Sequence, residues 1–225
     1  LHCDVLLDQT FGRNKSDYFT CVDPSTLMLC GTKYALLREQ FSKNRECAIT
    51  KRKSYRGIKH ILISFGGADF NNNSANILDI IFDMDFNHNP KIEVVLGTRS
   101  LYFDEIKKQV KHSKLDVRIF PYVENMASLM LNADVAIGAG GSTSWERCTL
   151  ALPTLLFIDA DNQLLVAKNL EKIGAVKVID KTKAYNETTK NILLELDNNI
   201  DKYTAMSQSA SEVCDGLGVE RVGVS

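Results

Sequence analysis

Short runs of consecutive apolar residues alternate along this chain with longer segments in which apolar residues recur every three or four positions. Runs that are apolar at successive positions, rather than at every second one, are typical of strands buried on both faces. The apolar runs occupy residues 60–65, 91–97, 115–123, 134–140, 153–159 and 175–180. The helix-like segments occupy residues 74–85, 101–113, 124–133, 142–152 and 162–174. This alternation predicts an α/β fold, a Rossmann-like parallel sheet with helices on both faces.

The two ends of the chain depart from this rhythm. Residues 3–8 resemble a short buried strand, and residues 25–41 contain an apolar run, Gly31 and a helix-like segment. Residues 42–57 are basic and poor in apolar side chains, which predicts a solvated helix face or connector, with an anion-binding segment as the alternative. Residues 188–214 are expected to be helical, in one piece or two.

Composition narrows the class of protein. The 225 residues are 44% hydrophobic and 24% charged with a net charge of −1, which is ordinary for a globular chain and gives no reason to expect a nucleic-acid partner. No apolar run reaches the roughly 18 residues of a membrane span, so neither a signal peptide nor membrane association is expected. The six cysteines form no CxxC pair and have no zinc-like spacing, which favours free thiols in a reducing cytoplasm and no metal site.

The most unusual segment is "AIGAGGSTSWERC", residues 136–148, where an apolar run ends in three glycines and a series of hydroxyl residues. In an open parallel sheet, ligands bind beyond the carboxyl ends of the strands, and this segment follows a predicted strand. Gly140 and Gly141 would let the backbone approach a ligand, and Ser142 and Thr143 open a helix whose free amides favour a diphosphate. Glu146, one turn into that helix, would reach ribose hydroxyls.

A structural explanation of the same residues stays open. Thr143 and Glu146 have the spacing of a capping box, and glycine before a helix is common. The segment matches neither GxGxxG nor GxxxxGK[ST], and it contains no lysine.

Two other loops at strand ends carry weaker signals. Gly66 and Gly67 either form a tight turn or bring a second backbone to the phosphates, and Asp69 is a candidate N-cap for the next helix. Asn162 and Gln163 stand at a helix start, where Asn162 either caps the helix or the two amides recognise sugar hydroxyls or an N-acetyl group.

Longer stretches of the chain resemble a known family. The segments "HCDVLLDQ", "LCGTKYALLREQF", "ILISFGGAD", "VENMASLMLNADVAIGAGGSTSWERCTLALPTLLF", "DNQ" and "DGLGVERV" occur in this order. Together they resemble the PseG family, the UDP-2,4-diacetamido-2,4,6-trideoxy-β-L-altropyranose hydrolases of bacterial pseudaminic acid biosynthesis. More broadly they resemble the GT-B superfamily near MurG and the spore-coat polysaccharide protein SpsG. The similarity covers nearly the whole chain, and Gly-Gly-Ser-Thr-x-x-Glu and Asn-Gln are its most specific parts.

The resemblance implies a fold, a reaction and a site. The family fold places two Rossmann-like domains across a cleft, and the C-terminal domain binds the UDP of a UDP-sugar. The implied reaction is inverting hydrolysis at the anomeric carbon, without cofactor or metal. The implied contacts are diphosphate at Gly140, Gly141, Ser142 and Thr143, ribose at Glu146, uracil at the backbone near Val123, the phosphate side at Gly66 and Gly67, and sugar at Asn162 and Gln163.

This chain departs from the family pattern at its start. The family's presumed catalytic base is the histidine of a Gly-x-Gly-His segment, and no such segment occurs here. The expected organisation is therefore a C-terminal piece of a longer protein. Residues 1–30 would be a remnant of an N-terminal domain with its last strand, 31–58 a linker, and 59–225 the UDP-sugar-binding domain with a C-terminal crossing tail.

The same expectation places the catalytic base in the missing N-terminal domain, which would be the partner of this chain. Within the chain, Asp161 and Asn162 are the nearest substitutes, together with Asp159. His60, His88 and His112 are not expected at the site. A UDP-sugar-dependent glycosyltransferase and a nucleotide-binding module without catalysis remain alternatives.

Overall fold

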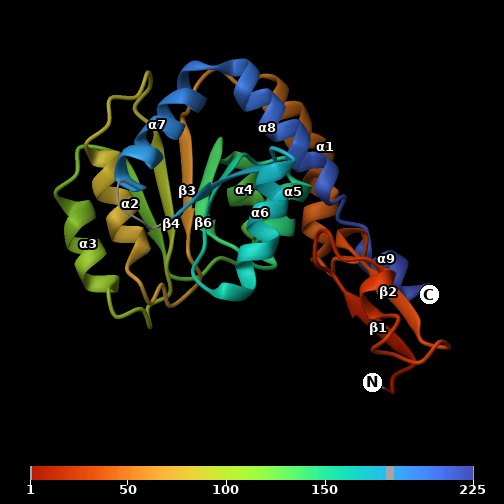
Figure 1. The fold of residues 1–225 in the computed structure, drawn as a ribbon. Coiled ribbons are helices and arrows are strands. Elements are labelled where there is room, and N and C mark those ends of the chain that lie inside the picture. The colour runs from red at the N-terminus through yellow and green to blue at the C-terminus, as the bar shows by residue number, and fades with distance from the viewer. Residues whose placement is uncertain (1, 181–184, 225) are drawn as a thin grey trace.

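The computed structural model describes residues 2–180 and 185–224, which form a large six-stranded sheet and a small two-stranded sheet (Figure 1). All paired strands of both sheets are parallel, as predicted for the large one. The large sheet has the order β5-β4-β3-β6-β7-β8. Its strands are β3 (His60–Ser64), β4 (Lys91–Val95), β5 (Val117–Phe120), β6 (Val135–Ala139), β7 (Thr154–Phe157) and β8 (Val176–Ile179).

Both faces of the large sheet are buried, which explains the continuous apolar runs. Ile61 and Ile63 of β3 belong to one hydrophobic cluster, and Leu62 between them belongs to the other. The first cluster includes residues of α2 (Asn73–Phe82), α3 (Phe103–Lys111) and α7 (Tyr185–Asn198). The second includes residues of α1 (Glu39–Lys53), α4 (Met126–Asn132), α5 (Thr143–Thr149) and α6 (Leu164–Lys172). Within the described residues, no helix has both the length and the apolar character that a membrane crossing needs.

The strand order creates a switch point at the centre of the sheet. Within the large sheet, the chain enters at β3, moves outward through β4 and β5, and returns to β6 on the other side of β3. Ser64 and Gly138 are register partners near the carboxyl ends of the two central strands. Because the connections after β3 and β6 leave in opposite directions, they open a crevice between them, the usual ligand position in such sheets.

The basic segment after residue 41 forms most of a helix that has an exposed face, as predicted, and a second face packed against the protein. It lies within α1, where Arg52 is only 3% exposed and donates hydrogen bonds to the Met130 and Ala133 carbonyls at the end of α4. Arg45 donates to the Thr149, Cys214 and Ser211 carbonyls. Carbonyls at helix ends attract cations, so these two arginines bind protein groups instead of a free anion.

The C-terminal helical segment consists of two helices. α7 ends at Asn198, and α8 (Ile200–Val213) begins after Asn199, whose side chain accepts a hydrogen bond from the Lys202 amide. The tail then forms α9 (Gly218–Gly223), and Arg221 donates to the Lys33 carbonyl at 2.8 Å. The tail therefore lies against the N-terminal part of the chain, next to β2 in Figure 1.

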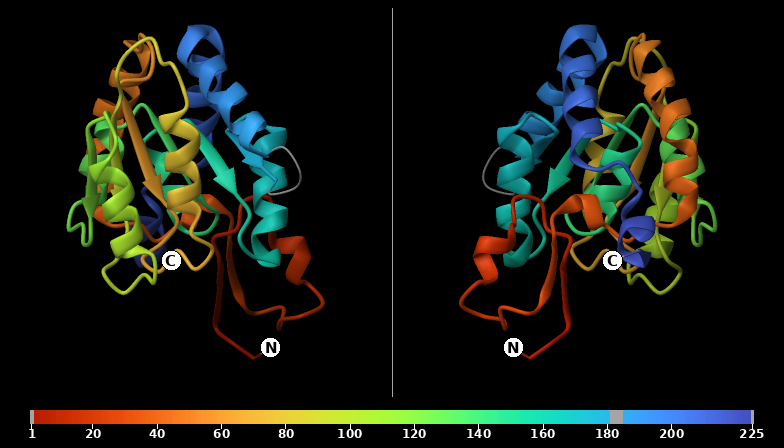
Figure 2. Two further views of the ribbon diagram at one scale, coloured as in Figure 1. Left: turned by 90° about the vertical axis from the view of Figure 1, so that its left-hand side faces the viewer. Right: turned by 90° about the vertical axis from the view of Figure 1, so that its right-hand side faces the viewer.

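The two apolar runs near the start of the chain form the small sheet. β1 (Val5–Asp8) pairs with β2 (Leu27–Cys30), so the strand near residues 3–8 is followed by a second strand of the same sheet. Figure 2 shows this sheet projecting from the larger one. Val5 and Leu27 are register partners, and both side chains are exposed.

Candidate functional site

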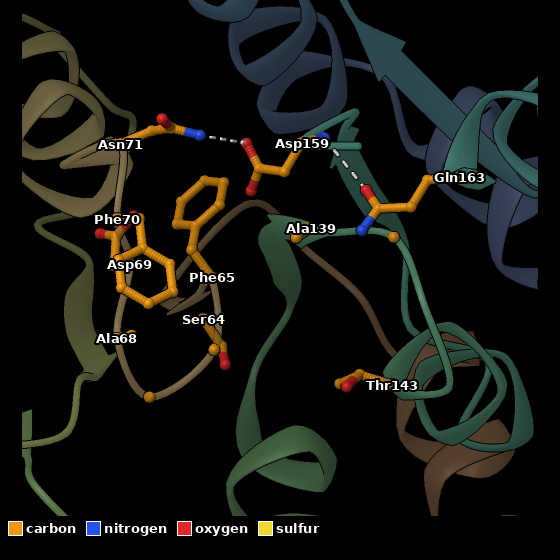
Figure 3. Close-up of a pocket in the computed structure, with 13 residues that line it drawn as sticks. Ser64, Phe65, Ala68, Asp69, Phe70, Asn71, Ala139, Thr143, Asp159 and Gln163 are labelled. Carbon is orange, nitrogen blue, oxygen red and sulfur yellow. Dashed lines mark hydrogen bonds between the residues drawn. The ribbon is translucent and has the colours of Figure 1, made fainter. Parts of the chain in front are cut away.

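A cavity of about 410 Å³ opens at the carboxyl edge of the large sheet, between the loops that follow β3 and β6. Five residues expected at the site from sequence line it together: Gly66, Gly67, Gly140, Thr143 and Gln163 (Figure 3). They come from three separate loops, which the parallel topology brings to one edge. Gly141 and Ser142 are exposed beside the cavity rather than in its lining.

The loop after β6 leads into α5 without a side-chain cap. Ser142 is the N-cap residue, and neither half of the Thr143–Glu146 capping box is formed, so that structural alternative is wrong. The first helical amides with acceptors are those of Ser144, bonded to the Gly141 carbonyl, and Trp145, bonded to the Ser142 carbonyl. Within residues 2–180 and 185–224, the Ser142 and Thr143 amides donate no hydrogen bond. These amides are available to an acceptor at the mouth of the cavity.

Glu146 is held by an arginine from the predicted linker. Its side chain is 19% exposed, and its Oε1 lies 3.6 Å from Nη2 of Arg38. Burial raises the pKa of Glu146 above its usual range, while the cations of Arg38 and Arg147 act in the opposite direction. Arg38 also donates to the Glu124 carbonyl at 3.2 Å. Val123, the residue before Glu124, is half-buried and does not line the cavity. Through its two contacts, Arg38 connects the loop of Val123 and Glu124 to Glu146.

The loop after β3 contains a buried carboxylate and an unconstrained glycine. Asp69 is 3% exposed, and its carboxylate accepts hydrogen bonds from the Asn73 and Ser74 amides at the start of α2, although the N-cap residue of that helix is Asn72 rather than Asp69. Gly66 has a φ of +86°, a conformation that favours glycine. Gly67 lacks a positive φ of this kind, and a Cβ built there meets no atom within 4 Å. Gly67 therefore has no evident packing reason to be glycine.

The loop after β7 is organised around Asp159. Its carboxylate accepts from Asn73 Nδ2 at 3.1 and 3.3 Å and from Asn71 Nδ2 at 3.4 Å. Its backbone amide donates to the Gln163 side-chain oxygen at 3.0 Å, as Figure 3 shows. A carboxylate that already accepts from amide groups is a poor candidate for a general base.

Asn162 and Asp161 project from this loop. Both are exposed and belong to η3 (Asp161–Gln163), whose N-cap residue is Ala160. Gln163 is the N-cap residue of α6, and neither helix start has a side-chain cap. The capping explanation of Asn162 is therefore wrong, and its amide is available for another contact.

The histidines lie away from the cavity. His60 stands at the amino end of β3, the opposite end from the crevice, with Nδ1 3.1 Å from the Asn132 carbonyl. His112 and His88 also lie near backbone carbonyls outside the cavity lining. Among the described residues, no group of three or more His, Cys, Asp or Glu side chains has the arrangement of a metal site.

Two arginines near the site, Arg38 and Arg147, were not expected from the sequence. Arg38 meets Glu146 across 108 positions, and no local pattern predicts that contact. Arg147 is 2% exposed and donates to the Ala139 carbonyl at 2.6 Å, and burial lowers its pKa to about 10. Its one sequence signal is its position as a cation among residues 145–152, which are otherwise mostly apolar.

Comparison with known proteins agrees with this geometry. The family model described as "Glycosyltransferase family 28 C-terminal domain" matches residues 26–217. An uncharacterised protein of Methanocaldococcus jannaschii, MJ1062, is 32% identical over 167 residues, covering 72% of this chain and 34% of the relative. A UDP-2,4-diacetamido-2,4,6-trideoxy-beta-L-altropyranose hydrolase of Campylobacter jejuni is 30% identical over 175 residues, covering 77% of this chain and 59% of the relative. The chain thus spans only about a third to three-fifths of these relatives.

Solved structures support the fold. The crystal structure of Acinetobacter baumannii MurG superposes with a TM-score of 0.60 at 19% identity, covering 73% of this chain and 50% of MurG. At this identity the likeness concerns architecture only, and it agrees with a GT-B type of Rossmann-like domain. Since the family model spans most of the chain, this protein belongs to the glycosyltransferase family 28 C-terminal domain family.

Proposed function

We infer that this chain is the nucleotide-binding half of a UDP-sugar hydrolase. The full protein would cleave UDP-2,4-diacetamido-2,4,6-trideoxy-β-L-altropyranose at the anomeric carbon with inversion and release UDP. The observation that carries this proposal is the cavity at the switch point, where two glycine-containing loops meet the open amide end of α5. The 30% identity to the Campylobacter jejuni hydrolase supports the choice of substrate.

Each loop has a role in this proposal. The diphosphate binds the backbone of Gly140 and Gly141 and the groups of Ser142 and Thr143, because free amides favour anions. Gly66 and Gly67 approach the phosphates from the other wall of the cavity.

The nucleoside and the sugar lie on either side of the diphosphate. Glu146 accepts from the ribose hydroxyls, and the backbone at Val123 recognises uracil, with Arg38 bridging the two segments. The free amide of Asn162 and the side chain of Gln163 face the sugar, where amides suit acetamido groups.

The water-activating base belongs, in this proposal, to an N-terminal domain of the same protein. Departure of UDP would be favoured by the amides that bind its diphosphate, since they stabilise the charge that develops there. Inverting hydrolysis also requires a base within hydrogen-bond reach of the attacking water, on the face opposite the leaving group.

Titration calorimetry with UDP and ADP tests nucleotide recognition. We expect UDP to bind more tightly than ADP, because the proposed base contact at Val123 is specific for uracil. Equal or tighter binding of ADP would contradict the assignment of a uridine nucleotide.

A UDP-sugar-dependent glycosyltransferase is the second candidate, favoured by the family itself, which is a glycosyltransferase family. Both activities use the same nucleotide site, so the products distinguish them. Free sugar formed by the full-length protein without an acceptor identifies a hydrolase. Turnover that depends on an added acceptor identifies a transferase.

A further inference from the structure

Arg147 lies directly beneath the loop that forms the cavity wall. It belongs to α5, and its guanidinium reaches back past the helix start to the end of β6. Nη2 donates to the Ala139 carbonyl at 2.6 Å and lies 3.3 Å from Ser144 Oγ. Nη1 occupies the space above Gly138, where a Cβ would stand 2.7 Å from it. Ala139, which accepts from this guanidinium, lines the cavity, as does Thr143, the residue before Ser144.

The charge of Arg147 is attracted by the Glu146 carboxylate but forms no ion pair with it. In the described part of the chain no carboxylate oxygen forms an ion pair with it, and its buried Nε has no hydrogen-bond partner. The neighbouring carboxylate of Glu146 pairs instead with Arg38. The pKa of Arg147, lowered by burial to about 10, still leaves the guanidinium protonated at neutral pH. Among the described residues the guanidinium contacts no carboxylate, and a buried cation in that position is costly, which points to a missing anion.

Arg147 belongs to the last turn of α5, but its guanidinium lies near the start of that helix, beside Ala139 and Ser144. The amino end of a helix carries a partial positive charge, so Arg147 adds a second positive charge where the first is already unfavourable. Arg52 provides the contrast, because it is equally buried and also has an unpartnered Nε, but it caps carbonyls at the negative end of α4. Arg52 therefore needs no ligand to explain it, whereas Arg147 does.

We propose that Arg147 is the fixed cation of the diphosphate site, acting from beneath the Gly138–Thr143 loop. It holds the loop through the Ala139 carbonyl and supplies the positive charge that a lysine provides in other phosphate loops, since this loop has none. The ligand class is a pyrophosphate group, free or in a nucleoside diphosphate. Arg147 is a positioning and electrostatic residue. The inference rests on the proposed function only where it takes the ligand to be a uridine nucleotide; binding of a pyrophosphate group does not depend on it.

The test compares binding of UDP, uridine and inorganic pyrophosphate to the wild-type chain and to Arg147→Gln. Glutamine keeps an amide that can donate to the Ala139 carbonyl but removes the charge. We expect affinity for UDP and pyrophosphate to fall about tenfold or more, because a unit charge near a polyanion in a partly buried site contributes at least that much. Uridine affinity should not change, and Arg52→Gln, the matched control, should leave all three affinities unchanged.

A second variant guards against simple unfolding. Arg147→Lys restores a charge whose pKa falls within reach of titration when buried, so its UDP affinity should decline more steeply than that of the wild type between about pH 7 and 9. Unchanged UDP and pyrophosphate affinity in a folded Arg147→Gln variant would overturn the proposal, as would a pH profile for Arg147→Lys that is no steeper than that of the wild type. If UDP and ADP bind equally but pyrophosphate affinity still depends on Arg147, the proposed function fails and this inference stands.

Discussion

Glu146 shows how one residue is placed for binding at a cost to folding. Its carboxylate is mostly buried, and burial raises its pKa, although Arg38 at 3.6 Å and Arg147 act against that rise. No capping bond to the start of α5 accounts for its presence. A buried carboxylate with one long ion pair has unused acceptor capacity, which suits ribose hydroxyls.

We predict that Glu146→Gln weakens UDP binding by about tenfold, since hydrogen bonds to a charged group contribute roughly 1.5–3 kcal/mol. The ionised form is the better acceptor, so wild-type affinity should fall as pH is lowered toward the raised pKa of Glu146. The variant should keep only the pH dependence that titration of the UDP phosphate itself causes. Calorimetric titrations at several pH values measure both effects, and a wild-type pH profile no steeper than that of the variant would contradict the ribose assignment.

The same substitution has the opposite expected effect on stability. A folded-state pKa above the unfolded value means that protonation favours the folded chain. That contribution is complete below the unfolded glutamate pKa and is lost as pH rises through the raised folded value. At neutral pH the ionised Glu146 therefore costs stability, and Glu146→Gln should melt at the same temperature or higher. Glu39→Gln, which removes an exposed carboxylate paired with Lys43, is the control.

At the scale of the elements, the loops after β3 and β6 differ in why they contain glycine. Gly138 is required by packing, because a Cβ there would lie 2.2 Å from the Ser64 carbonyl of the neighbouring strand. Gly141 is required by conformation, with a φ of +129°. Gly67 meets neither condition although it lines the cavity. The remaining reason for a glycine is close approach of a ligand to the backbone.

We predict that Gly67→Ala leaves the melting temperature nearly unchanged but weakens UDP binding. The added methyl group meets no protein atom and would instead occupy the space of the ligand. Gly223→Ala in α9 is the matched control, because its Cβ also meets nothing and it lies outside the cavity. Parallel melting and binding measurements on the two variants decide the matter, and equal UDP affinity would argue against ligand contact at Gly67.

At the scale of the whole molecule, the groups able to act as a general base are either committed or remote. Asp69 accepts from two backbone amides at the start of α2, and Asp159 accepts from two asparagine side chains. His60 lies at the opposite end of β3 from the cavity. Asp161 is exposed in η3, outside the cavity lining.

We predict that this 225-residue chain does not hydrolyse the UDP-sugar, although the full-length protein does. Hydrolysis needs a base beside the attacking water, and restoring upstream sequence with a Gly-x-Gly-His segment should restore activity. Chromatographic detection of released UDP measures both proteins. UDP release by the isolated chain at a rate near that of the full-length protein would refute the assignment of the base to the N-terminal domain. The base would then be Asp159 or Asp161, and substitution of each by Asn would show which.

Periodicity in the sequence was sufficient to predict the large sheet and most of its helices. Strands buried on both faces are apolar at successive positions, and helices show their spacing locally, so neither signal depends on distant residues. The edge of the sheet that carries the site was also predictable, because parallel strands bring all their carboxyl ends together. Five of the expected site residues accordingly line one cavity.

What the sequence left undecided depends on contacts between distant positions. Whether Glu146 closes a capping box or faces Arg38, and whether Asn162 caps a helix, turned on side-chain partners that no local pattern reveals. The packing of the basic helix α1 and the burial of Arg147 beneath its loop depend likewise on carbonyls supplied by other elements. The physical reason is that hydrogen bonds and ion pairs of buried polar groups form only once packing has excluded water and brought their partners within reach.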